Sequence, residues 1–169
     1  PPACAKNHIA VGSVDSDTDG TSSFSSWGPT DDGRIKPDIS APGCQVGGDG
    51  GVTSLSSFSF NGYGQKCGTS MAAPTAAGIS ALILQHSRDP CPDRDDLRNA
   101  TIKALLANTA VDRGNIGPDY KYGYGSIRAD QAVDTVIAEN IVESEVAQGG
   151  TYQGIIIVDP GQSQLQVTI

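Results

Sequence analysis

The sequence changes character at Gly68-Thr69-Ser70-Met71-Ala72-Ala73-Pro74, and the interpretation of the whole chain depends on this stretch. An Ala-, Leu- and Ile-rich run follows it as far as Ser87. Thr-Ser with a proline in the opening turns is a helix-start signal. Because the run is apolar nearly all round, we predict a helix over 69–87 that is buried rather than lying on a surface.

Ser70 would lie in the first turn of that helix, next to Gly68, which lets another backbone approach closely. A hydroxyl there lies beside unsatisfied N–H groups and the positive end of the helix dipole, and both favour an oxyanion. Serine is otherwise a weak nucleophile and needs a neighbouring base. A serine at such a position is most often only a helix cap, so its location alone assigns no role.

Short apolar, Gly-rich and Pro-containing segments, typical of strands and turns, precede the predicted helix. We expect a strand at 8–14, an acidic turn at 15–20, a segment at 22–26 that pairs back, an extended segment at 35–43, and a hairpin or mobile loop at 47–64 with 52–60 as its ordered part.

Two further helices are predicted after residue 94 from apolar side chains at helical spacing, over 95–109 and over 128–139. After Ile141 the composition shifts to Glu, Gln and Gly, and segments 155–158 and 165–169 then resemble strands. We therefore predict a domain boundary here, with 1–141 in one domain and 142–169 as a linker and the beginning of a β-rich domain.

Charge and hydropathy argue against two classes of partner. The net charge is −8, and Lys and Arg are scattered singly, so no basic stripe for nucleic acid is expected. The longest apolar stretch, 79–84, is far shorter than the roughly 20 residues of a membrane span, so no membrane partner is expected. The 4 cysteines lack zinc-ligand spacing, and an even cysteine count in an acidic chain favours a secreted protein over a reduced cytosolic one.

Residues 68–74 resemble the nucleophile signature of the subtilisin-like serine proteases at every defining position. Other segments are similar to the family in the same order and spacing: 9–15, 22–29, 36–43 and 122–127 with Ala129. The resemblance covers roughly residues 6–141.

This resemblance implies a serine endopeptidase that acts on protein or peptide substrates through an acyl-enzyme on Ser70, without an organic cofactor. Gly68, Thr69 and Met71 would lie against the substrate, and the Ser70 N–H would donate to the oxyanion. The family's Asp, His and oxyanion Asn precede the serine in chain order, so a missing N-terminal part would supply them. The implied fold is a three-layer α/β domain around a mainly parallel sheet, of which this chain forms the C-terminal part.

His8 and His86 lie outside any segment that resembles the family's catalytic-histidine motif, so we expect neither to be the general base. A structural role is favoured for His8, and contact with terminal helix carbonyls for His86. An inactive subtilase-like pseudoprotease or binding module is the alternative. An esterase is less favoured, because its motif needs glycine where Ala72 stands.

By the same resemblance, Cys44 and Cys67 would lie at the two ends of the hairpin, which makes a disulfide between them plausible. Two buried free thiols are the other interpretation, and Cys4 and Cys91 are left over. Residues 15–20 match the opening of a calcium loop, but Ser26 stands where such a loop needs glutamate. An acidic hairpin turn is therefore favoured over structural calcium.

Overall fold

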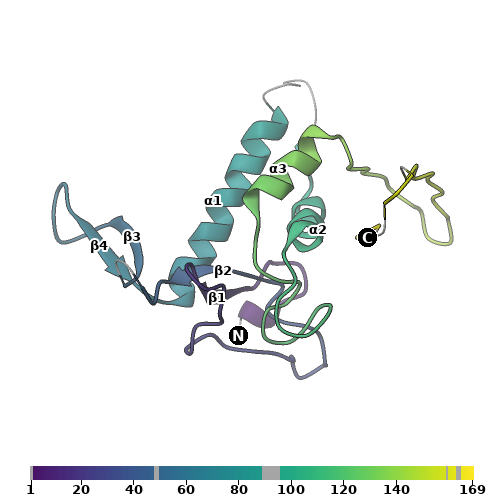
Figure 1. The fold of residues 1–169 in the computed structure, drawn as a ribbon. Helices are drawn as coiled ribbons and strands as arrows, with labels where there is room; N and C mark the ends of the chain where they lie inside the picture. Colours follow the sequence, from purple (N-terminus) through teal and green to yellow (C-terminus); the bar gives the residue numbers. More distant parts are fainter. Residues whose placement is uncertain (1, 48–49, 89–95, 159, 163–164) are drawn as a thin grey trace.

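The computed structural model describes residues 2–47, 50–88, 96–158, 160–162 and 165–169 (Figure 1). Over these residues the chain is a mixed α/β structure with small sheets and three α-helices. Its elements in order are a 3-10 helix η1 (Pro2–Cys4), strands β1 (Val11–Asp15), β2 (Ile39–Cys44), β3 (Val52–Leu55) and β4 (Tyr63–Lys66), and helices α1 (Thr69–Arg88), α2 (Asn99–Thr109) and α3 (Ala129–Ile137).

Strands β1 and β2 form a parallel pair, and their register runs from Val11 opposite Ile39 to Asp15 opposite Cys44. A parallel bridge between Ser40 and Ser126 extends this pair on the other side of β2. Parallel pairing was expected from the family resemblance. The larger sheet of a three-layer domain is not formed by these residues.

The segment after the acidic turn folds back onto the outer edge of β1, as predicted for 22–26. The Ser22 N–H donates to the Ser13 carbonyl at 2.9 Å, and the Ser13 N–H donates to the Ser25 hydroxyl oxygen at 3.0 Å. The hydroxyls of Ser13 and Ser22 lie 2.8 Å apart. Because Ser13 is fully buried, these bonds satisfy polar groups that water does not reach.

Helix α1 packs against both strands of the parallel pair and contacts α3, which in turn contacts α2. The core is made of small and branched apolar side chains from β2, from the three α-helices and from the segments that lead into α2 and α3. Its buried members are Ile39, Ala41, Ala72, Ala76, Ile83, Leu97, Ile102, Leu105, Leu106, Ile127 and Ala132.

The start of α1 agrees with the prediction, but its burial does not. The buried residues of α1 are Ala72, Ala76, Ile83 and Ser87, whose spacing places them on one face. The other side is open, with Leu82 61% exposed. A helix buried all round was therefore the wrong prediction for this chain, because its described residues provide no element to cover the second face.

The other two helices are shorter than predicted. Helix α2 begins at Asn99 and has no acidic residue in its first turn, and residue 95 lies outside the described residues. Helix α3 ends at Ile137, two residues before Glu139, which has a φ of 53° in the left-handed region. Such a conformation is incompatible with further α-helix, which explains the early end.

Strands β3 and β4 form an antiparallel hairpin, so the hairpin alternative is confirmed. The ordered part predicted at 52–60 is wrong, because the chain turns after Leu55 and the second strand begins at Tyr63. Val52 lies opposite Lys66, and Leu55 lies opposite Tyr63. The hairpin projects away from the helices and the parallel strands (Figure 1).

The described residues after α3 contain no helix or strand, so the strands predicted at 155–158 and 165–169 are absent from this structure. Ile155 and Ile157 are 94% and 88% exposed. A strand requires a partner for its backbone groups, and no described segment pairs with these residues. The domain boundary near 142 stays a prediction. No helix among the described residues is long and apolar enough to cross a bilayer.

Candidate active site

Ser70 is the second residue of α1, and the end of β2 holds the loop in front of it. The Gly68 N–H donates to the Gly43 carbonyl at 2.9 Å. A Cβ on Gly43 would lie 2.7 Å from the Gly68 carbonyl oxygen and 3.0 Å from the Ala72 Cβ. Glycine at position 43 therefore lets strand, loop and helix meet closely enough to place Ser70.

The first turn of α1 leaves donors available near the Ser70 hydroxyl. The Gly68 carbonyl accepts from the N–H groups of Met71 at 2.9 Å and Ala72 at 3.3 Å. The N–H groups of Thr69 and Ser70 donate to no described residue, and Ser70 is exposed. Free N–H groups at a helix N-terminus attract negative charge, so this position suits an oxyanion.

Pro74 lies within α1 and has no N–H to donate to the carbonyl of Ser70, its partner four residues earlier. The side chain of the next residue bonds to two other carbonyls. The Thr75 hydroxyl lies 2.9 Å from the Met71 carbonyl oxygen and 3.4 Å from the Pro42 carbonyl oxygen. Thr75 therefore holds the proline-containing turn against the end of β2.

The predicted site residues Gly68, Thr69, Ser70 and Met71 lie together at this helix start. Met71 is half-buried, and its Sδ lies 3.6 Å from the point that a Cβ on Gly68 would occupy. The thioether of Met71 therefore lies over Gly68, two residues before Ser70.

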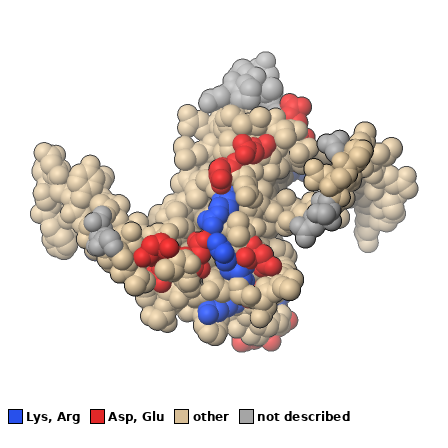
Figure 2. Space-filling model, viewed as in Figure 1, with Lys and Arg blue, Asp and Glu red and all other residues tan. Residues whose placement is uncertain are grey.

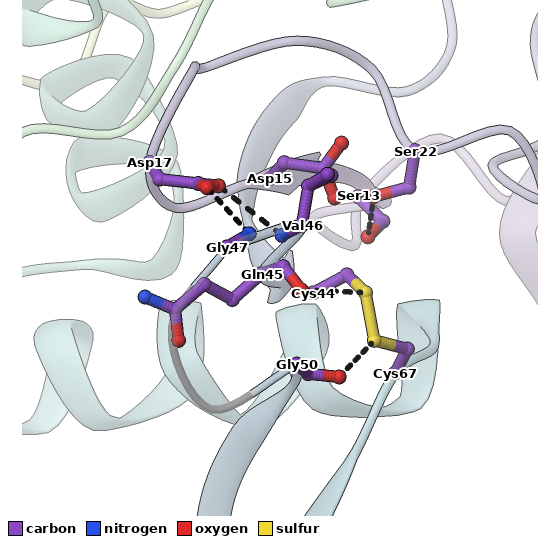
Figure 3. The surroundings of a disulfide bond; sticks show 10 residues. All are labelled: Ser13, Asp15, Asp17, Ser22, Cys44, Gln45, Val46, Gly47, Gly50 and Cys67. Atoms are coloured by element: carbon purple, nitrogen blue, oxygen red, sulfur yellow. Dashed lines mark hydrogen bonds between the residues drawn. A yellow bond between two sulfur atoms is a disulfide. The ribbon is translucent and has the colours of Figure 1, made fainter.

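A disulfide joins Cys44 and Cys67, with the Cα atoms 4.5 Å apart, so the predicted pairing is confirmed (Figure 3). Each cysteine adjoins one of the two glycines that are hydrogen-bonded to each other in front of Ser70. The covalent bond and that hydrogen bond together fasten the loop in front of Ser70, the predicted nucleophile, to β2. We call this loop, residues 67–68, the nucleophile loop. Cys4 is free and exposed, and Cys91 lies outside the described residues.

Asp17 in the acidic turn binds the segment that follows Cys44 (Figure 3). Its carboxylate accepts from the Gly47 N–H at 2.8 Å and from the Val46 N–H at 3.3 Å. The bond from Gly47 is the main cause that lowers the pKa of Asp17. Asp17 is therefore an anchor for the segment that enters the hairpin.

Asp19 accepts from donors on a different part of the molecule. Its carboxylate lies 2.5 Å from Arg113 Nη2, 2.8 Å from Arg128 Nη2 and 3.0 Å from the Ser126 hydroxyl. Burial opposes ionisation of Asp19, but these donors, Arg128 first, lower its pKa. Within the described ranges, no group of three or more His, Cys, Asp and Glu side chains could hold a metal ion.

Neither histidine is hydrogen-bonded to Ser70 in the described part of the chain. His86 is on α1 itself, about 24 Å from Ser70 along the axis at about 1.5 Å per residue. His8 has both ring nitrogens buried, without a hydrogen-bond partner in the described part of the chain. The Ser70 hydroxyl also makes no hydrogen bond with a described residue, so these residues bring it no base.

Comparison with known proteins assigns the chain to a family. The model of the Subtilase family, Peptidase_S8, matches residues 1–125. The chain belongs to the subtilase family.

Two curated subtilase relatives match most of the chain. "Serine protease AprX" of Bacillus subtilis (strain 168) is 38% identical over 144 residues, which cover 78% of this chain and 31% of AprX. "Halolysin-like extracellular serine protease Nep" of Natrialba magadii is 37% identical over 134 residues, which cover 79% of this chain and 20% of Nep. The chain therefore spans less than a third of these relatives.

Solved structures agree with the family. The CspB protease of Clostridium perfringens has a TM-score of 0.65 and 32% identity, and the match covers 80% of this chain and 28% of that protein. A lanthipeptide protease also has a TM-score of 0.65, with 26% identity over 79% of this chain and 43% of its own.

One cluster in this subtilase chain was not predicted as important from the sequence. Asp38, just before β2, is buried and accepts from Lys36 Nζ at 2.5 Å, Lys103 Nζ at 2.8 Å and the Ala10 N–H at 2.7 Å. Burial opposes its ionisation, but Lys103 and then Lys36 lower the pKa of Asp38. The cluster fixes the start of β2, the strand whose other end holds the nucleophile loop. The only signal in the sequence was Lys-Pro-Asp within the segment 36–43.

The basic side chains gather in a narrow column on the face shown in Figure 2, with acidic side chains on both sides. That face therefore carries no broad positive surface for a phosphate backbone.

Proposed function

We propose that this chain is the nucleophile-bearing part of a serine endopeptidase that hydrolyses peptide bonds through an acyl-enzyme on Ser70. The observation that carries the proposal is the exposed Ser70 at the start of α1, in a chain of the subtilase family. Two N–H groups beside it have no acceptor among the described residues. Oriented donors of this kind stabilise the charge that develops on the carbonyl oxygen during acyl transfer.

The Ser70 oxygen attacks the scissile carbonyl carbon while its proton passes to a histidine. The resulting oxyanion accepts from the Ser70 N–H and from an asparagine side chain. Collapse breaks the C–N bond, and the histidine returns the proton to the leaving amine. Water, deprotonated by the same histidine, then hydrolyses the ester and restores the serine. Gly68, Thr69 and Met71 bind the substrate backbone around the scissile bond.

The Asp, His and oxyanion Asn come from an N-terminal part of the same catalytic domain, which completes the three-layer fold. Two observations support this part of the proposal. The chain spans only 31% of AprX. One face of α1 is open, and Leu82 on it is 61% exposed, as expected if another part of the domain covers it.

The substrates are proteins or peptides, and the protein works in an extracellular or periplasmic setting. The Cys44–Cys67 disulfide supports this location, because disulfides persist in oxidising compartments. A relative named as an extracellular serine protease supports it as well.

Labelling with a fluorophosphonate probe tests the proposal in the complete protease. The probe should react with Ser70 in the unsubstituted protein, and Ser70→Ala should abolish the reaction. Ser80→Ala is the matched control, because Ser80 lies on the same helix and its hydroxyl bonds to the Ala76 carbonyl at 2.8 Å. Labelling that survives Ser70→Ala would show that another residue is the nucleophile.

An inactive pseudoprotease or binding module is the second candidate. It is favoured by the absence of a base near Ser70 among the described residues. In that case the complete protein would bind polypeptides but give no Ser70-dependent labelling or turnover.

A further inference from the structure

The β3–β4 hairpin, residues 51–67, displays large apolar side chains that nothing in the described chain covers. The four residues concerned are Leu55 at 78% exposure, Phe58 at 91%, Phe60 at 107% and Tyr63 at 72%. Exposed apolar groups that gather on one element are typical of interaction sites rather than of ordinary surface.

These side chains stand on a well-defined turn. The Ser56 N–H donates to the Gly62 carbonyl at 2.9 Å, and the Phe58 N–H donates to the Ser56 hydroxyl oxygen at 3.2 Å. A Cβ on Gly62 would lie 2.6 Å from the Ser59 Cβ, so the turn is tight. A rigid display reduces the entropy that a partner's binding would cost.

The hairpin offers a partner contacts that do not depend on charge. Lys66, at its base, is the sole charged residue between Gly50 and Cys67. Leu55 and Tyr63 are directly opposed, so their side chains lie on the same face of the hairpin. Among the described residues, β3 and β4 pair with each other and with no other strand, so their outer edges have backbone groups that an extended peptide could bond.

The base of the hairpin is attached directly to the nucleophile loop. The disulfide closes the base of the hairpin. A Cβ on Gly51 would lie 3.0 Å from the backbone nitrogen of Lys66, so the two strands approach closely there. β4 ends at Lys66 and α1 begins at Thr69, one residue before Ser70. The hairpin thus joins the rest of the chain at the start of α1 (Figure 1), so a polypeptide bound along it would lie on the element that leads into Ser70.

We propose that the β3–β4 hairpin is a docking arm for protein substrates, which binds an extended, uncharged, apolar segment of the same polypeptide that Ser70 cleaves. The inference rests on the proposed function. The hairpin continues directly into the nucleophile loop, so we infer that the bound polypeptide is the substrate. Because the hairpin carries almost no charge, the segment that it binds should be uncharged and apolar. Burial of the aromatic side chains provides the affinity.

The test uses the complete protease with the double substitution Phe58→Ser and Phe60→Ser. The control is Ile116→Ser, which removes an apolar side chain that is 103% exposed outside the hairpin. We expect kcat/KM for casein to fall about tenfold in the double variant, as for the loss of an aromatic hot spot. Hydrolysis of a short peptide anilide and the rate of fluorophosphonate labelling should not change, and the control should behave like the unsubstituted enzyme.

A binding measurement separates this inference from the proposed function. Casein affinity is measured on the Ser70→Ala background, where the hairpin double variant should bind about tenfold more weakly even if Ser70 is not the nucleophile. If the fluorophosphonate probe does not label Ser70 but the double variant still binds casein more weakly, the proposed function is wrong and the hairpin remains a docking arm.

Three results would overturn the docking arm. Equal loss of casein and short-peptide hydrolysis with a lower Tm would mean that the hairpin packs against the rest of the protease. A change of oligomeric state without a change in casein binding would mean that it contacts a second copy. Unchanged casein binding and hydrolysis with an unchanged oligomeric state would mean that it binds no substrate.

Discussion

At the residue scale, the position of Ser70 depends on Gly43 more than on any contact of the serine itself. A side chain at position 43 would meet the Ser13 hydroxyl first, and then the Gly68 carbonyl and Ala72, so these groups would have to move. In the complete protease, Gly43→Ala should lower the free energy of unfolding by about 1 to 3 kcal/mol, as overpacking does. It should also slow fluorophosphonate labelling of Ser70.

Gly64→Ala is the matched control for Gly43→Ala, because a Cβ there would meet its nearest atom at an ordinary 3.9 Å. Thermal unfolding and labelling rates should both be unaffected by it. Equal effects of the two substitutions would show that the approach of β2 to the nucleophile loop is not what positions Ser70.

Met71 is the only methionine of the chain, and its half-buried thioether lies over Gly68. Peroxide converts such a thioether to a bulkier, polar sulfoxide. Turnover of the complete protease should therefore fall as the sulfoxide of Met71 accumulates in mass spectra, and Met71→Leu should resist the treatment. Full turnover with Met71 fully oxidised would remove this residue from the substrate-binding surface.

Much of the candidate site was predictable from the sequence, because its residues are contiguous from Gly68 to Met71. The role of Gly43 and the buried pairing of Asp38 were not predictable in the same way. Both depend on contacts between residues far apart in the chain, such as Asp38 with Lys103. The types and spacing of residues along the sequence do not reveal which distant residues come into contact in the fold.

At the element scale, the disulfide closes a loop with a sequence separation of 23 between Cys44 and Cys67. Replacing both cysteines by alanine should lower the free energy of unfolding by about 3 kcal/mol on the chain-entropy estimate. Chemical denaturation of the complete protease measures this. Cys4→Ala is the control and should have no effect, because Cys4 is free and exposed. Free thiols at both positions in a non-reducing peptide map would contradict the pairing.

Helices and strands that are marked by their local sequence were predicted well. Features that depend on packing or pairing with another segment were not. The start of α1 and the strand segments that became β1 and β2 were recognisable from composition and proline placement. The open face of α1 and the missing strands at 155–158 have the same cause: local sequence indicates what an element would bury, but not whether a neighbour is there to bury it.

At the scale of the whole molecule, Asp38 ties β1, β2 and α2 together, and its lowered pKa links stability to pH. Its usual pKa is 3.8. A carboxyl with a lowered pKa in the folded protein contributes stability above its unfolded pKa, and this is lost as pH falls through the folded pKa. The free energy of unfolding should therefore decrease as pH falls below about 4.

The variant Asp38→Asn isolates this contribution. It should be less stable than the unsubstituted protein at pH 7, and the difference should narrow as the pH is lowered. Urea unfolding at several pH values measures both curves. A difference that stays constant with pH would show that the ionised carboxylate of Asp38 does not stabilise the fold.

The chain by itself should not hydrolyse casein at a rate that depends on Ser70, because a serine hydroxyl without a base is hardly nucleophilic at neutral pH. Addition of the N-terminal part in trans should restore activity if the two parts associate. Ser70-dependent turnover by the 169-residue chain alone would mean that His8 or His86 acts as the base.

The ring closed by Cys44 and Cys67 also has a consequence for self-digestion. Exposed loop tips are preferred sites of nicking, and the hairpin tip carries Phe58 and Phe60 in full contact with solvent. A cut at that tip would open the ring but would not release either piece, because the disulfide still joins the two strands at their base. The nicked enzyme should migrate as one band on a non-reducing gel and as two after reduction. Ser70 and β2, the strand that holds the loop in front of it, would thus stay together after the chain has been cut beside them.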